Sequence, residues 1–72
     1  MFKLLADYAD RDLGYVVRGE TVVGKIWPDS TEDSPQPFMI MMRGKIIRES
    51  NGDRMHFKSI RDAFNWVDAN YA

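Results

Sequence analysis

The sequence predicts an α+β fold, in which a C-terminal helix covers one face of an antiparallel sheet of three to five strands. Two observations lead to this prediction. Short runs of β-branched and aromatic residues, separated by turn residues, occupy most of the chain. The last segment, about residues 59–71, repeats apolar residues at helical spacing instead. With 72 residues and no linker-like tract, the chain is expected to form one domain, residues 1–72.

The C-terminal helix has both a start signal and an apolar stripe. Ser59 occupies the N-cap position, and Asp62 places an acid near the positive end of the helix dipole. One face carries the residues that are expected to meet the sheet, namely Ile60, Ala63, Phe64, Val67 and Tyr71. Trp66 lies at the edge of this stripe. A helix with one wide apolar face requires a sheet to cover it.

The first part of the chain contains three candidate strands. Residues 1–12 alternate as a strand would, although a helix is also compatible, and we favour a strand that frays into a polar turn at residues 10–12. Residues 14–18 and 21–27 are joined by Gly19-Glu20, a link suited to a tight hairpin. Residues 28–37 contain three prolines and are expected to form an exposed loop that buries nothing.

The second part continues with strands up to the helix. Residues 38–42 form a continuous apolar run, which is typical of a strand covered on both faces. Gly44 is expected to end or bend that strand. Residues 45–49 and 54–57 are then predicted to pair as a hairpin around Asn51-Gly52.

Strand parity predicts a second apolar face that the helix leaves uncovered. On one strand Val22, Gly24 and Ile26 share a face, and on the next strand Phe38, Ile40 and Met42 do so. Parity alone does not decide which set faces the helix. Either choice leaves apolar surface outside, and such a patch usually marks an interface. The candidate partner-binding residues are Lys25, Trp27, Met39, Met41 and Arg43.

Composition excludes several classes of protein. No cysteine is present, so disulfides and thiolate metal sites are excluded. No apolar run reaches the roughly 18 residues of a membrane span, and the N-terminus lacks a signal-peptide pattern. We therefore expect a cytoplasmic protein with no membrane partner. The net charge is only −1, but residues 1–37 carry four basic and seven acidic side chains, whereas residues 38–72 carry six and four.

The sequence offers little to support catalysis. His56 is the only histidine, and neither a nucleophile-elbow nor a phosphate-binding glycine pattern occurs. The run Asp29–Asp33 begins like a calcium loop, yet Ser34 and Ile40 stand where that loop needs glycine and an acid. We therefore predict no catalytic residue, no metal and no cofactor. A pocket lined by His56 and a carboxylate would be needed to support an enzyme.

A DNA-binding module is the alternative interpretation. Basic residues interleaved with aromatic ones on a sheet can hold phosphates and stack on bases. The basic residues that would form such a surface are Lys25, Arg43, Lys45, Arg48 and Arg54.

Two resemblances bear on function. The segments Gly-Tyr-Val-Val-Arg, Val-Val-Gly-Lys-Ile and Phe-Lys-Ser-Ile-Arg-Asp-Ala-Phe-Asn-Trp-Val, within residues 14–71, resemble small accessory proteins of phages and prophages. Phe57, Ala63 and Trp66 are also similar to the Phe, Ala and Trp that end the arm-binding domain of tyrosine integrases. That family places its sheet in the DNA major groove, but the insertion from Arg43 to Arg54 and the acidic balance depart from it.

Taken together, these patterns predict a small non-enzymatic module that binds a protein partner or a second copy of itself. The likeness to phage accessory proteins implies that the partner is a host factor, which the protein would inhibit or modulate in the host cytoplasm.

Overall fold

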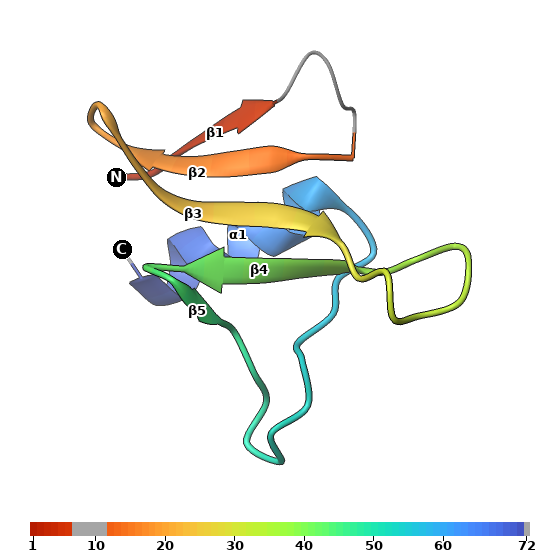
Figure 1. Cartoon of the computed structure of the whole chain (residues 1–72). Coiled ribbons are helices and arrows are strands. Elements are labelled where there is room, and N and C mark those ends of the chain that lie inside the picture. The colour runs from red at the N-terminus through yellow and green to blue at the C-terminus, as the bar shows by residue number, and fades with distance from the viewer. Residues whose placement is uncertain (7–11, 72) are drawn as a thin grey trace.

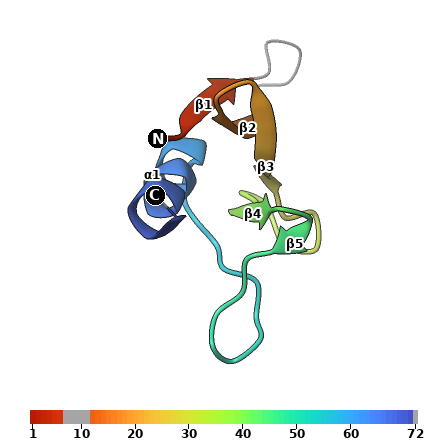
Figure 2. The same ribbon diagram turned by 90° about the vertical axis from the view of Figure 1, so that its left-hand side faces the viewer.

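The predicted α+β architecture is confirmed by a computed structural model, which describes residues 1–6 and 12–71. The five strands form one antiparallel sheet in chain order, and the helix packs on β3 and β4 from one side only (Figure 1, Figure 2). The elements in chain order are β1 (Lys3–Ala6), β2 (Gly14–Arg18), β3 (Thr21–Pro28), β4 (Phe38–Met42), β5 (Lys45–Ile46) and α1 (Ile60–Tyr71). The predicted strand near the N-terminus is β1, whereas its expected fraying turn falls partly on residues 7–11, outside the described residues.

Tight turns connect the central strands. Gly19 has a φ of 63° in the two-residue link between β2 and β3, as the predicted hairpin requires. Arg43 and Gly44 have φ values of 52° and 80°, so both central residues of the β4–β5 turn are left-handed. That combination characterises the hairpin turn whose twist matches the strands it joins. The prediction that Gly44 ends the strand is confirmed.

The hairpin around Asn51-Gly52 forms, but the two long strands predicted for it do not. Only Lys45–Ile46 is a regular strand, and residues 47–57 make isolated bridges instead, Arg48 with Arg54 and Phe57 with Phe38. The reason is that the free edge of β4 is shared. β5 pairs with its last two residues, while Phe57 exchanges both backbone hydrogen bonds with Phe38 at its start, at 2.8 and 2.9 Å. Neither segment can therefore extend along the whole of β4.

The helix starts as predicted. The Asp62 N–H donates to Ser59 Oγ at 3.0 Å, and the Ser59 carbonyl accepts the Ala63 N–H at 3.1 Å, which defines Ser59 as the N-cap. Ala63, Phe64 and Val67 are buried against the sheet. Tyr71 was expected in the same stripe but is 40% exposed. It lies in the last turn of α1, and its ring packs on that of Trp66 with the centroids 6.0 Å apart.

The face of the sheet toward α1 carries the main core. Val16, Ile26 and Ile40, one from each central strand, have no exposed surface and belong to the same cluster as the buried helix residues. Val22 was expected to share this face with Gly24 and Ile26, but it is 57% exposed. The pairing of β2 with β3 shifts register between Val16 and Val17, so β3 has an extra residue there and the alternation is broken.

Gly24 allows the close packing at the centre of the sheet. A Cβ atom on Gly24 would collide with Met42 Sδ and would lie 2.8 Å from the Met41 carbonyl oxygen and 3.3 Å from Val16 Cβ. The sulfur of Met42 can move, but the Met41 carbonyl belongs to the neighbouring strand and cannot move without disturbing the ladder. We therefore expect the variant Gly24→Ala to lower the free energy of unfolding by about 1–3 kcal/mol, as measured by urea denaturation.

The matched control is Val22→Thr, two residues earlier on the same strand at an exposed position, where the change should stay within about 0.5 kcal/mol. Equal stability of Gly24→Ala and the wild type would show that this close approach does not limit packing.

Candidate functional site

A row of paired residues crosses the whole sheet on the face turned away from α1. The register pairs Leu5 with Tyr15, Tyr15 with Lys25, Lys25 with Met41, and Met41 with Ile46. Directly opposed residues of antiparallel strands share one face. Their neighbours along the strands, including Val16, Ile26 and Ile40, point into the core, so these five residues point away from it. We call them the outer row, and Figure 1 looks onto this face, with α1 behind the sheet.

The outer row is apolar and accessible apart from one charge at its centre. Leu5 is 52% exposed, and Tyr15, Lys25, Met41 and Ile46 are half-buried. Tyr15, Lys25 and Met41 also line a surface hollow of about 380 Å³, which extends to the β4–β5 turn. The Lys25 ammonium lies 5.3 Å from the centroid of the Trp27 ring, an arrangement that holds the cation against an aromatic face.

The five predicted partner-binding residues are only partly brought together. Lys25, Trp27 and Met41 lie on the outer face, and Arg43 lines the hollow from the turn. Met39 pairs with Trp27 on the same face but is only 4% exposed, so its side chain is not available to a partner. Sequence reasoning missed three members of the outer row, Leu5, Tyr15 and Ile46. Only the strand register could have identified them, because they come from three different strands.

The five basic residues of the DNA-binding alternative do not gather on one face. Lys45 pairs with Met42, whose side chain is buried in the core, so Lys45 lies on the helix side of the sheet, opposite to Lys25. Arg48 Nη1 donates to the Gly52 carbonyl at 2.9 Å within its own hairpin. Arg54 forms an ion pair with Asp29 at 2.9 Å. Of the five, Lys25 belongs to the outer row and Arg43 lies beside it in the lining of the hollow.

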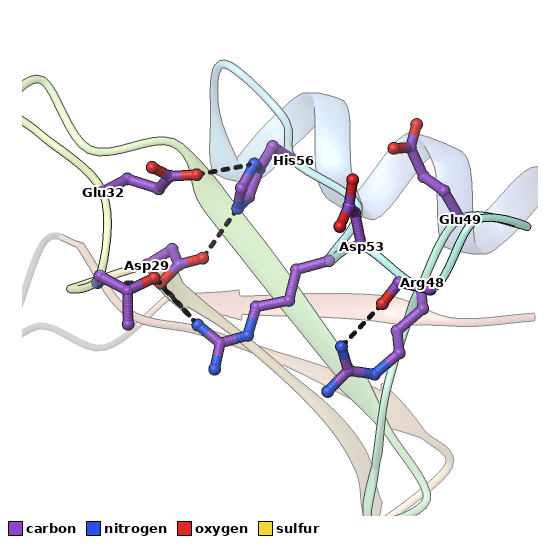
Figure 3. Close-up of a pocket in the computed structure, with 9 residues that line it drawn as sticks. Asp29, Glu32, Arg48, Glu49, Asp53 and His56 are labelled. Atoms are coloured by element: carbon purple, nitrogen blue, oxygen red, sulfur yellow. Dashed lines mark hydrogen bonds and ion pairs between the residues drawn. The ribbon is translucent and has the colours of Figure 1, made fainter.

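A polar cluster closes one end of the sheet and contradicts the expectation that residues 28–37 bury nothing. Asp29, at the end of β3, is 1% exposed and is the only buried charged residue in the described part of the chain. The Thr31 N–H and hydroxyl donate to its Oδ1 at 3.0 and 2.6 Å, and Arg54 Nη1 donates to the same oxygen at 2.9 Å. His56 Nε2 lies 2.8 Å from Oδ2 (Figure 3). Asp29 therefore ties its own loop to the segment that precedes α1.

These hydrogen bonds keep Asp29 ionised. They hold the pKa of Asp29 well below its usual range, with the Thr31 hydroxyl as the largest cause and the His56 hydrogen bond as the second. Burial acts in the opposite direction, and the Thr31 N–H and Arg54 reinforce the lowering. Because an ionised carboxylate only accepts hydrogen bonds, His56 Nε2 carries the hydrogen that it shares with Asp29.

The cluster places a histidine between two carboxylates, one on each side of its ring. Glu32 Oε1 lies 3.8 Å from His56 Nδ1, on the opposite side of the ring from Asp29 (Figure 3). Oxygen and nitrogen atoms of Asp29, Glu32 and His56 lie within 4.8 Å of one another, a separation compatible with a shared cation, and each ring nitrogen of His56 faces a different carboxylate. Arg54 already occupies the other oxygen of Asp29. The cluster itself lines a hollow of about 520 Å³, so the pocket with His56 and a carboxylate that an enzyme would need is present. Both ring nitrogens of His56 face carboxylates of this chain.

Comparison with protein-family models, with curated proteins and with solved structures found no match. Within residues 1–6 and 12–71, no helix has the length and apolar character needed to cross a membrane. Function must therefore be argued from the surface of this chain itself.

The Asp29 cluster predicts a specific dependence of stability on pH. A carboxyl group whose pKa is lower in the folded state stabilises the fold above its unfolded pKa, about 3.9, and this contribution is lost as the pH falls toward the folded value. We expect the melting temperature of the wild type to fall below about pH 4. In Asp29→Asn, which should melt lower at neutral pH, this dependence should be weaker.

Thermal melts over a range of acidic and neutral pH would test this expectation, with Asp33→Asn, an exposed aspartate of the same loop, as the matched control. If Asp29→Asn and Asp33→Asn showed the same profile, the buried carboxylate would not be the source of the acid sensitivity.

Proposed function

We propose that this protein is a non-enzymatic binding module that contacts a protein partner through the outer row. The observation that carries the proposal is the register, which aligns four apolar side chains and one lysine across all five strands. A contiguous apolar patch of this kind is typical of an interaction surface. The half-buried Tyr15 and Trp27 supply the large amphipathic side chains in which interfaces concentrate their binding energy.

The surface supports a protein partner better than DNA. Binding to DNA depends on many cations that neutralise phosphates together, and the outer row contains one cation among four apolar residues. Two of the other candidate cations, Arg48 and Arg54, already bind groups of this chain. The likeness to phage accessory proteins adds that the partner would be a host factor in the host cytoplasm.

Site-specific photocrosslinking would test the proposal. A photoreactive phenylalanine derivative replaces Met41 in the outer row or, as the matched control, Asp68, which is exposed on α1 away from the sheet. In extracts of the cells that naturally produce the protein, we expect one discrete crosslinked protein from position 41 and none from position 68. Equal crosslinking at the two positions, or none at either, would contradict the proposal.

Salt dependence separates the two functions. Fluorescence anisotropy with a random-sequence DNA duplex should show no binding at moderate salt, because the described cations are dispersed. If the duplex does bind, its affinity is measured at several salt concentrations, and each phosphate contact contributes about −0.9 to the slope of log K against log salt. A slope that corresponds to several such contacts would replace the protein-binding proposal with the DNA-binding alternative.

A further inference from the structure

The charges beside the outer row indicate the chemistry of the partner, provided that the proposed function holds. We infer that the outer row receives a protein segment that presents apolar side chains together with a carboxylate, and that this carboxylate pairs with Lys25 and Arg43. The occupant is a different protein, not a second copy of this chain.

The first observation is an uncompensated charge at the hollow. Lys25 and Arg43 both line it, beside Tyr15, Val23 and Met41, and no acidic residue of the described part of the chain contributes to its lining. Neither cation forms an ion pair with a carboxylate among the residues that the structure describes. At the other end of the same face, by contrast, Arg54 is paired with the buried Asp29. At the Asp29 end of the face, the cation of Arg54 is therefore paired with a carboxylate of this chain. At the hollow, Lys25 and Arg43 are available to pair with a carboxylate of a ligand.

The second observation is the mixture of those cations with apolar surface. Lys25 is half-buried between Tyr15 and Met41 in the row and lies over the Trp27 ring. A partner that covers the apolar residues would also remove Lys25 from water, which is costly for a charge that stays unpaired. A free phosphate or a DNA backbone would leave Met41 and Leu5 uncovered. A peptide segment with both apolar and acidic side chains satisfies both requirements.

Symmetry disfavours a second copy. A two-fold dimer buries the same patch from both subunits, so a dimer formed across the outer row would bring each Lys25 close to its twin. Like charges that oppose one another destabilise a pairing, and among the residues that the structure describes no carboxylate lines the hollow to offset them. The outer row therefore suits an acidic partner better than it suits itself.

Selection from a random short-peptide display library tests the inference and does not require the partner to be identified first. The wild-type protein should enrich peptides that combine aromatic or aliphatic residues with Asp or Glu. Synthetic copies of these peptides should bind Lys25→Glu at least about tenfold more weakly, because the variant places two carboxylates together. Lys25→Met, which preserves the apolar stem, should also bind more weakly, while Lys25→Arg should retain binding.

The matched control is Lys45→Glu, the same charge reversal at an exposed lysine on the helix side of the sheet, which should leave peptide affinity unchanged. Circular dichroism confirms that each variant is folded, and Lys25→Met keeps the test decisive if Lys25→Glu unfolds.

The inference would be overturned if the library enriched apolar peptides without acidic residues, and if these peptides lost binding to Met41→Glu but not to Lys25→Met. That result would leave the proposed function standing. If no enriched peptide responds to Met41→Glu, both fail. A dimer that buries the outer row, detected as a concentration-dependent mass that Met41→Glu abolishes, would also overturn the inference.

Discussion

One helix can cover only one face of a five-stranded sheet, and the rest of this structure follows from that constraint. The 12 residues of α1 pack on β3 and β4, and on this face of the sheet Val16 of β2, Ile26 of β3 and Ile40 of β4 lose all contact with solvent. Within residues 1–6 and 12–71, no second helix or sheet covers the opposite face. At one end of this face, Asp29 and Met39 are buried. Elsewhere on the face, the outer row leaves apolar side chains accessible to solvent.

The local parts of the fold could be predicted because their signals lie close together in the chain. The N-cap at Ser59, the Gly19 turn and the end of β4 at Gly44 each depend on a few neighbouring residues, and all three form as expected. Of the strands predicted for residues 45–49 and 54–57, only Lys45–Ile46 formed a regular strand, because local propensity cannot reveal that β5 and Phe57 share one edge of β4. The break in alternation at Val22 has a similar origin, since it depends on how β2 pairs with β3.

The candidate sites were less predictable because they are assembled from distant residues. Asp29 lies 25 residues before Arg54 and 27 before His56, so an acidic loop that reads as solvated becomes the anchor of a buried cluster. In the outer row, Lys25 and Met41 could be placed on one face by parity, but Leu5 and Ile46 join them only through the register of the two outer strand pairs. Met39 shows the converse, because parity placed it on the correct face without showing that it is buried.

The Asp29 cluster and the outer row have separate roles on the outer face: the cluster holds a loop in place, and the row is the surface proposed to bind a partner. The hydrogen bonds around Asp29 join the end of β3 to the segment before α1, so they hold the loop without using the apolar residues of the row. Regular strands, rather than loops, carry every member of the row, and side chains on paired strands are positioned before any partner arrives. A preformed surface loses little conformational entropy on binding. Affinity can then come from the apolar residues, while the charge of Lys25 discriminates between partners, because a segment without a carboxylate would leave that charge buried and unpaired.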